Sequence, residues 1–274
     1  MTGRRKIRLL VSDVDGTLVT HDKVLTEEAK AAALALRQAG IAFAITSSRP
    51  PRGMRMLFEP LALEGPIAGF NGGVYVKPDL SMVRSHLLDP AAAREAVTLM
   101  RDAGLDVWVY TPDEWLIHNP DAPHVAREAW IIKFDPKVVQ DFSDAHLAQA
   151  AKIVGVSDDA DRVAACEAKA QAALGDRASA VRSQSYYLDV THPQANKGAV
   201  VTTLSGLLHI PAEEIATIGD MPNDVLMFRQ SGFSIAMGNA SDAVKAQASA
   251  VTDSNEDEGF AKAVHHFILG REGG

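Results

Sequence analysis

The hydrophobic positions of the chain form short apolar runs separated by longer stretches with helical spacing. Residues 7–11 are one such run and predict a buried parallel strand. Thr26 is a good N-cap for a helix that begins with two acidic residues, and Gly40 is expected to end it. Residues 41–45 form the next apolar run. The start of the chain is therefore expected to be a β-α-β unit whose two strands are parallel neighbours.

The sheet is expected to continue with antiparallel strands at one edge. Residues 66–70 predict a third strand. Asn71-Gly72-Gly73 followed by residues 74–76 predicts a hairpin, because Asn-Gly is a strong turn former. Residues 82–85 are expected to add a further antiparallel strand at that edge.

The pattern changes after residue 86. Helical stretches alternate with strand-like runs, at residues 90–103, 106–110, 152–156, 158–174 and 186–190. The segment 112–136 contains four prolines, and we expect it to be the least regular part.

The first pattern then resumes with an apolar helix over residues 197–208 and a strand over 214–218. We therefore expect an α/β fold with two domains. A Rossmann-like parallel-sheet core would comprise residues 1–86 and 188–274, and a smaller α/β cap domain, residues 87–187, would be inserted into it.

Composition restricts the class of protein. The chain has 274 residues, enough for a main domain and a smaller one. A net charge of −8 argues against a nucleic-acid partner, which requires a basic face. The single cysteine, Cys166, excludes an intrachain disulfide and indicates a reducing compartment. No apolar run is long enough to span a membrane, and residues 1–6 are followed by too short a run for a signal peptide, so we expect a cytoplasmic protein. The oligomeric state is left open.

Candidate chemistry begins where the first strand ends. Asp13 and Asp15 lie two residues apart and are followed by Gly16, which allows a tight turn. Two carboxylates this close repel, so they share a proton or hold a cation between them. Mg²⁺ suits such a site because it prefers oxygen ligands. The alternative interpretation is an ordinary acidic turn.

Polar residues also follow the other strands of the predicted core, at the edge where α/β sheets bind ligands. Thr46-Ser47-Ser48-Arg49 follows the second strand, and Asp220 and Asp224 follow the strand over residues 214–218. Lys197 begins a helix, where a cation is unfavourable unless it faces an anion. A polar loop, an acidic N-cap and a surface lysine are the alternative interpretations.

These segments resemble the motifs of one family. Asp13-Val14-Asp15-Gly16-Thr17 resembles the first motif of the haloacid dehalogenase superfamily of phosphotransferases, and Gly219-Asp220-Met221-Pro222-Asn223-Asp224 matches its fourth motif, Gly-Asp-x-x-Asn-Asp. Ser47 and Lys197 occupy the positions of the second and third motifs. Four motifs in this order, with a cap between the second and third, resemble the Cof-type branch, which has a subclass IIB cap. Segments 236–240 and 252–255 resemble further strand and loop endings of that branch. They are expected to have a mainly structural role, closing the loop that carries the metal ligands.

The resemblance implies roles for these residues. Asp13 would be the nucleophile that forms an aspartyl-phosphate, and Asp15 the general acid/base, with a pKa raised by its neighbour Asp13. Mg²⁺ would be held by Asp13, the backbone carbonyl of Asp15 and Asp220, with Asp224 supporting. The phosphoryl group would be bound by Val14, Ser47, Ser48, Lys197 and Asn223. Thr46 competes with Ser47 for the hydroxyl role, because Ser48 stands where relatives have Gly. Arg49, Asn71 and Gly72 are candidates for the substrate side.

The function implied is an Mg²⁺-dependent phosphatase. It would hydrolyse small phosphomonoesters, such as sugar phosphates or related metabolites, with the cap acting as a lid that selects the leaving group. The partner is then a small phosphorylated metabolite, and the particular substrate stays open. The alternatives are a phosphosugar mutase of the same superfamily, a phospho-accepting signalling domain, or a non-catalytic metabolite-binding protein.

Overall fold

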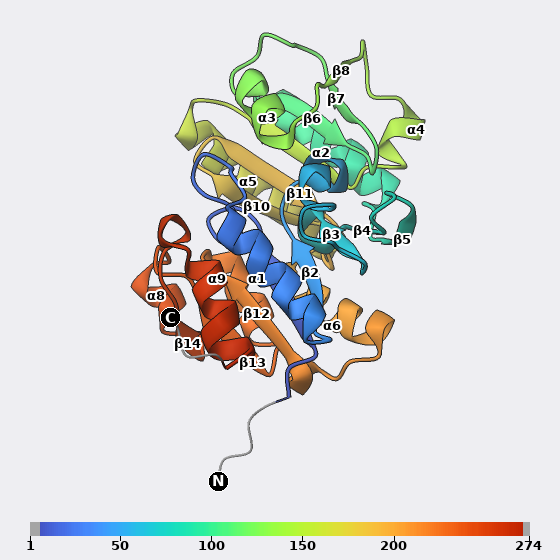
Figure 1. Ribbon diagram of the computed structural model, residues 1–274. Coiled ribbons are helices and arrows are strands. Elements are labelled where there is room, and N and C mark those ends of the chain that lie inside the picture. Colours follow the sequence, from blue (N-terminus) through green and yellow to red (C-terminus); the bar gives the residue numbers. More distant parts are fainter. Residues whose placement is uncertain (1–5, 271–274) are drawn as a thin grey trace.

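A computed structural model describes residues 6–270 and shows two domains, each built on its own sheet (Figure 1). Residues 1–5, which belong to the segment that argues against a signal peptide, lie outside the described residues. Among the residues described, no helix is both long and apolar enough to cross a membrane.

The core domain contains an eight-stranded sheet in the order β14-β13-β12-β1-β2-β3-β4-β5. Neighbours from β14 to β3 pair in parallel, whereas β4 and β5 pair antiparallel at the edge, as the sequence predicted. The strands are β1 (Leu9–Asp13), β2 (Ala42–Thr46), β3 (Ile67–Gly69), β4 (Val74–Val76), β5 (Met82–Ser85), β12 (Ile215–Gly219), β13 (Phe233–Ala236) and β14 (Ala250–Val251).

Helices cover both faces of the core sheet. Leu10 of β1 packs in the hydrophobic cluster that contains α1 and α9, while Leu9 and Val11 pack in the cluster that contains α6 and α7. Alternate residues of β1 therefore face opposite layers, and all three are fully buried. The helices are α1 (Glu27–Gln38), η1 (Pro51–Leu57), α6 (Lys197–Leu208), α7 (Val225–Phe228), α8 (Asp242–Lys245) and α9 (Gly259–Ala263).

The cap domain contains a six-stranded sheet in the order β10-β11-β9-β6-β7-β8. Its pairs are antiparallel except for β7 with β8. The strands are β6 (Asp106–Tyr110), β7 (Trp115–Ile117), β8 (Lys137–Val138), β9 (Lys152–Val156), β10 (Ser179–Gln184) and β11 (Tyr187–Thr191). The helices are α2 (Pro90–Asp102), α3 (Val125–Ile132), α4 (Asp144–Leu147) and α5 (Ala160–Leu174), of which α2 and α5 pack on one face of the sheet.

Two features of the cap differ from the sequence expectations. The segment 112–136 is more regular than its prolines suggested, because it contains β7, which is buried, and α3, which buries Val125 and Ile132. The second sheet also extends beyond residue 187, since β11 pairs with β9 and β10 as far as Thr191. The exact domain bounds stay a prediction.

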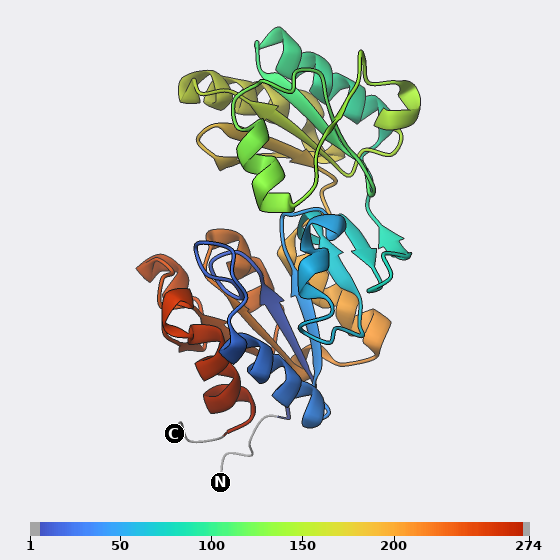
Figure 2. The same ribbon diagram turned by 45° about the horizontal axis from the view of Figure 1, so that its top comes forward.

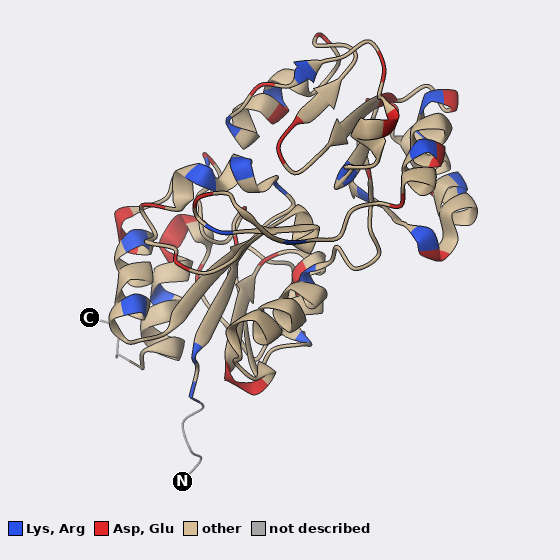
Figure 3. Ribbon diagram, turned by 90° about the vertical axis from the view of Figure 1, so that its right-hand side faces the viewer, with Lys and Arg blue, Asp and Glu red and all other residues tan. Residues whose placement is uncertain are grey.

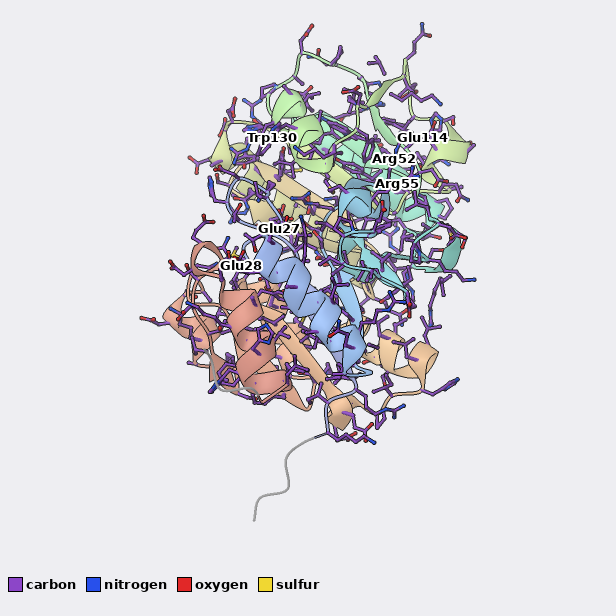
Figure 4. The ribbon with its side chains drawn as sticks, viewed as in Figure 1. Glu27, Glu28, Arg52, Arg55, Glu114 and Trp130 are labelled. Atoms are coloured by element: carbon purple, nitrogen blue, oxygen red, sulfur yellow. The ribbon has the colours of Figure 1, made fainter. Side chains whose placement is uncertain are left out.

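The other face of the cap sheet is turned toward the core domain, with α3 between them (Figure 2). Trp108 and Tyr110 of β6 belong to the same hydrophobic cluster as Phe70 and Met54 of the core. Helix α3 packs against η1, and Figure 4 shows Trp130 on α3 above Arg52 and Arg55 on η1. The boundary between the domains is therefore partly apolar.

Charged residues are distributed over both domains. Figure 3 shows Lys and Arg interspersed with Asp and Glu along the helices and loops of the core and the cap.

Candidate active site

The site lies at the carboxyl end of β1. Asp13 is the last residue of that strand and is 4% exposed. The chain then turns at Gly16, whose φ is +78°, and a Cβ there would meet Asp220 Oδ2 at 2.5 Å. Glycine is therefore required both by the backbone conformation and by the close approach of Asp220. Thr17 Oγ1 donates a hydrogen bond to Asp220 Oδ1 at 3.2 Å, which joins the first and fourth sequence motifs.

Three carboxylates and one ammonium meet at this point. Asp13, Asp220 and Asp224 each offer an oxygen, and these oxygens lie within 4.8 Å of one another. Lys197 Nζ donates to Asp13 Oδ1 at 2.6 Å and to Asp224 Oδ1 at 2.5 Å. Lys197 is 3% exposed, so it is a buried cation at the helix start rather than a surface lysine. Asp224 is held further by the backbone N–H groups of Asp220 and Met221.

Burial dominates the electrostatics of this cluster. It raises the pKa of Asp13 well above the ordinary value, against the lowering effect of Lys197 and together with the charges of Asp224 and Asp220. Burial and the charge of Asp224 raise the pKa of Asp220 to about 6. Burial disfavours the charge of Lys197, but the attraction of Asp13 and Asp224 outweighs it and raises the lysine pKa. The cluster therefore favours a bound proton or cation.

The donor set fits a hard metal ion. All three acidic residues offer carboxylate oxygens, which are ligands of the kind Mg²⁺ takes. Asn239 closes the loop around them, since its Nδ2 donates to Gly16 O at 2.9 Å and to Asp220 Oδ2 at 3.2 Å. Asn255 N in turn donates to Asn239 Oδ1 at 3.1 Å. Segment 236–240 therefore contacts the first and fourth motifs through Asn239, and segment 252–255 contacts Asn239; their role around a metal stays a prediction.

Asp15 lies beside this cluster with basic partners of its own. Arg49 Nε donates to Asp15 Oδ2 at 2.8 Å and Nη2 to Oδ1 at 2.6 Å, while Lys23 Nζ lies 2.8 Å from Oδ1. Burial would raise the pKa of Asp15, but Arg49 and Lys23 outweigh it and lower the pKa to about 2. The expected raised pKa is therefore wrong for this state, because the two cations act more strongly than Asp13.

The end of β2 supplies the second loop. Ser47 Oγ lies 3.5 Å from Asp15 Oδ2 and accepts from the backbone N–H of Arg49. Thr46 Oγ1 is buried and has no hydrogen-bond partner among the described residues. Ser48 is exposed, and its carbonyl faces Lys152 of the cap.

The hairpin at residues 71–73 is joined to this loop. Asn71 N donates to Ser47 O at 2.8 Å, and Asn71 has a left-handed φ of 55°. Gly72 has a φ of +96°, and a Cβ there would lie 2.8 Å from both Tyr75 and Val200. The predicted turn therefore exists, and it supports the end of β2.

For two predicted phosphate ligands, Val14 and Asn223, the structure gives less direct support. Val14 is fully buried, and its carbonyl accepts from the turn that follows. Asn223 is exposed in the short η5 turn (Pro222–Asp224), close in sequence to the buried Asp224. Their roles stay predictions.

Sequence reasoning missed Lys23 and Thr17 as partners of the acidic groups. Lys23 belongs to no recognisable pattern, although it follows the acidic loop by a few residues and has a left-handed φ of 63°. Thr17 stands in the quoted motif, and its hydroxyl two residues after Asp15 was a usable indication.

Comparisons with known proteins agree with this arrangement. The model of the haloacid dehalogenase-like hydrolases matches residues 10–264. The 5-amino-6-(5-phospho-D-ribitylamino)uracil phosphatase YcsE of Bacillus subtilis is 25% identical over 265 residues, covering 96% of both chains.

Solved structures share the whole fold. A haloacid dehalogenase-like hydrolase from Bacteroides thetaiotaomicron is 26% identical with a TM-score of 0.89, covering 96% of this chain and 100% of that one. The subclass IIB sugar phosphatase BT4131 is 19% identical with a TM-score of 0.79, covering 95% of this chain and 98% of that one. The cap fold is therefore similar to that of a subclass IIB phosphatase. The chain belongs to the haloacid dehalogenase-like hydrolases, and the Cof type expected from its four motifs is supported.

Proposed function

We propose that the protein is an Mg²⁺-dependent phosphatase that hydrolyses small phosphomonoesters through an aspartyl-phosphate at Asp13. The observation that carries this proposal is the buried cluster of Asp13, Asp220 and Asp224 around Lys197, at the carboxyl end of β1. The similarity to YcsE, named as a phosphatase of a phosphorylated ribitylaminouracil, supports a small phosphorylated metabolite as substrate.

Asp13 is the nucleophile in this proposal. Its carboxylate oxygen attacks phosphorus while the ester oxygen leaves, which splits one slow hydrolysis into two easier displacements. Lys197 already contacts Asp13 and supplies positive charge where two anions must meet. Mg²⁺, held by Asp13, Asp220 and the backbone carbonyl of Asp15 with Asp224 in support, would neutralise further negative charge.

Asp15 is the general acid/base. In the structure its carboxylate is held by Arg49 and Lys23 and is ionised at neutral pH. A phosphate dianion arriving beside it raises its pKa, since like charges disfavour ionisation. The carboxyl group can then donate a proton to the leaving alcohol and later accept one from the water that hydrolyses the aspartyl-phosphate.

The phosphoryl oxygens are bound from the second loop and the helix starts. Ser47 is favoured over Thr46 as the hydroxyl ligand, because Ser47 Oγ lies 3.5 Å from Asp15. Backbone N–H groups near Val14 and Ser48, and the side chains of Lys197 and Asn223, would complete the cradle. The cap would exclude water and select the leaving group.

The first experiment is phosphate release from a panel of small phosphomonoesters, with and without Mg²⁺. We expect metal-dependent release that is lost in Asp13→Asn. Asp15→Asn is expected to lose turnover while it folds and binds metal like the parent protein. Undiminished release by Asp15→Asn would contradict its role, and phosphoryl transfer between sugar positions without release would indicate the mutase instead.

A further inference from the structure

The cap sheet presents a buried lysine and aspartate on the face turned toward the core. Lys152 of β9 is paired with Tyr110 of β6 and with Thr191 of β11, and Asp189 lies two residues before Thr191 on the same face. Lys152 Nζ is 3.6 Å from Asp189 Oδ2. The side chains of Lys152 and Asp189 are 10% and 15% exposed. This pair is distinct from the four motif segments of the core.

The hydrogen-bonding capacity of this pair is not filled by the protein. An ammonium has three donors, yet the polar contacts of Lys152 Nζ lie at 3.5 Å, to Ser48 O, and at 3.6 Å, to Asp189. Lys197, by comparison, has contacts of 2.5 and 2.6 Å. Asp189 Oδ1 is buried without a hydrogen-bond partner among the described residues. Buried polar groups left in this way lose free energy that a suitable ligand restores.

The pair also lies next to the phosphate end of the site. Ser48, whose carbonyl Lys152 faces, directly follows Ser47 at the end of β2. The ammonium is held over the rings of Tyr110, at 5.2 Å, and Phe70, at 6.0 Å. A group bound by Lys152 and Asp189 would therefore belong to the part of the substrate nearest the phosphoester.

Charge decides which chemical group fits. An anionic group on Lys152 would lie beside Asp189 and also near Glu128, which interacts with both residues. A cationic group on Asp189 would lie against Lys152. A neutral hydroxyl avoids both repulsions, because its oxygen accepts from the ammonium while its hydrogen is donated to the carboxylate.

We propose that Lys152 and Asp189 select substrates that carry a hydroxyl on the carbon next to the phosphoester. The hydroxyl accepts a hydrogen bond from Lys152 Nζ and donates one to the carboxylate of Asp189. The substrate class is thus a phosphorylated polyol or sugar rather than a simple alkyl or aryl phosphate. This inference rests on the proposed phosphatase function and adds the residues that choose its leaving group.

The test uses two esters that differ by one hydroxyl, 1,2-propanediol 1-phosphate and propyl phosphate. We expect the parent protein to prefer the diol ester by about tenfold or more in kcat/KM, the size of one charge-assisted hydrogen bond. In Asp189→Ala and Lys152→Met this ratio should fall toward one, chiefly through a higher KM for the diol ester. Asp189→Asn should recover part of the ratio, because an amide oxygen still accepts a hydrogen bond.

Matched controls are available on the outer part of the cap. Asp141 and Lys137 are exposed and form surface ion pairs with Arg101 and Glu114. Asp141→Ala and Lys137→Met are expected to leave the ratio unchanged. A ratio near one in the parent protein, or an equal loss for both esters in Asp189→Ala, would overturn the proposal.

A binding measurement separates this inference from the proposed function. Calorimetric dissociation constants of both esters are measured for Asp13→Asn, alone and combined with Asp189→Ala. A preference for the diol ester that disappears with Asp189→Ala supports the subsite even if the parent protein releases no phosphate from any ester, a result that would overturn only the phosphatase function. Equal binding of the two esters to Asp13→Asn would overturn the subsite.

Discussion

Arg49 connects the carboxylate of Asp15 to the cap. Two of its nitrogens bind the carboxylate, at 2.8 and 2.6 Å, and Nη1 donates to the carbonyl of Ile131 in α3 at 2.9 Å. The arginine is 5% exposed, so these contacts are shielded from solvent. The position of Asp15 is therefore linked through one side chain to the position of the cap.

We predict that Arg49→Lys lowers kcat by roughly tenfold to a hundredfold, because a lysine cannot hold both carboxylate oxygens and the acid/base is left less well positioned. Arg49 also lowers the pKa of Asp15, so the limb of the pH–rate profile that reports Asp15 should move to higher pH. Steady-state kinetics from pH 4 to pH 8 measure both effects, with Arg52→Lys as a control on the exposed side of η1. An unchanged profile would show that Arg49 only braces the loop.

Gly16 offers a test of the close approach between the first and fourth motifs. Gly16→Ala places a Cβ 2.5 Å from Asp220 Oδ2, whereas Gly40 has a similar φ of +71° and nothing within 4 Å. We expect both substitutions to cost about 1 kcal/mol for the left-handed backbone. Gly16→Ala should cost more in urea unfolding and should also weaken metal binding, since Asp220 must move. Equal losses of unfolding free energy in Gly16→Ala and Gly40→Ala, with unchanged metal binding, would show that the close approach of Gly16 to Asp220 has no consequence.

The convergence of the strand ends could be predicted from the sequence. Asp13, Ser47 and Asp220 each follow an apolar run, and parallel strands with right-handed crossovers bring their carboxyl ends to one edge. The antiparallel edge was also predictable, from Asn71-Gly72 and the spacing of the runs around it. Periodicity and turn chemistry are local properties, which is why these features can be recognised without coordinates.

The partners of Asp15 and the cap pair could not be predicted in this way. Lys23 reaches Asp15 from a polar turn, and nothing in the apolar pattern fixes where a turn lysine points. Lys152 and Asp189 lie in two strands that α5 and β10 separate in the chain, and their contact depends on the register of β9 with β11. Without that register a lysine that begins one strand and an aspartate within another have no visible relation.

Lys197 should matter for stability as well as for catalysis. It is buried between Asp13 and Asp224, so Lys197→Met leaves two buried carboxylates without their cation. Removing one partner of a buried ion pair costs roughly 3–5 kcal/mol, and we expect a loss of that order in the free energy of unfolding without metal. Mg²⁺ should restore part of it by binding the same carboxylates. Lys262→Met, in an exposed pair with Asp253, is the control and should have a much smaller effect. An unfolding free energy in Lys197→Met equal to that of the parent protein would contradict the buried pairing.

Metal binding should depend on pH through Asp220. Its pKa is raised to about 6 in the metal-free protein, so its protonated form contributes stability at low pH, and this contribution is lost as the pH rises through 6. A metal ligand must be deprotonated, so metal binding is favoured above pH 6, where Asp220 is ionised. We expect the affinity for Mg²⁺ to be at least about tenfold weaker at pH 5 than at pH 7.5, because one proton on Asp220 with this pKa already requires that change. Calorimetry in buffers of different ionisation enthalpy should also detect proton release on binding near pH 6 and little at pH 8. A constant affinity without proton release would show that Asp220 does not ligate the metal.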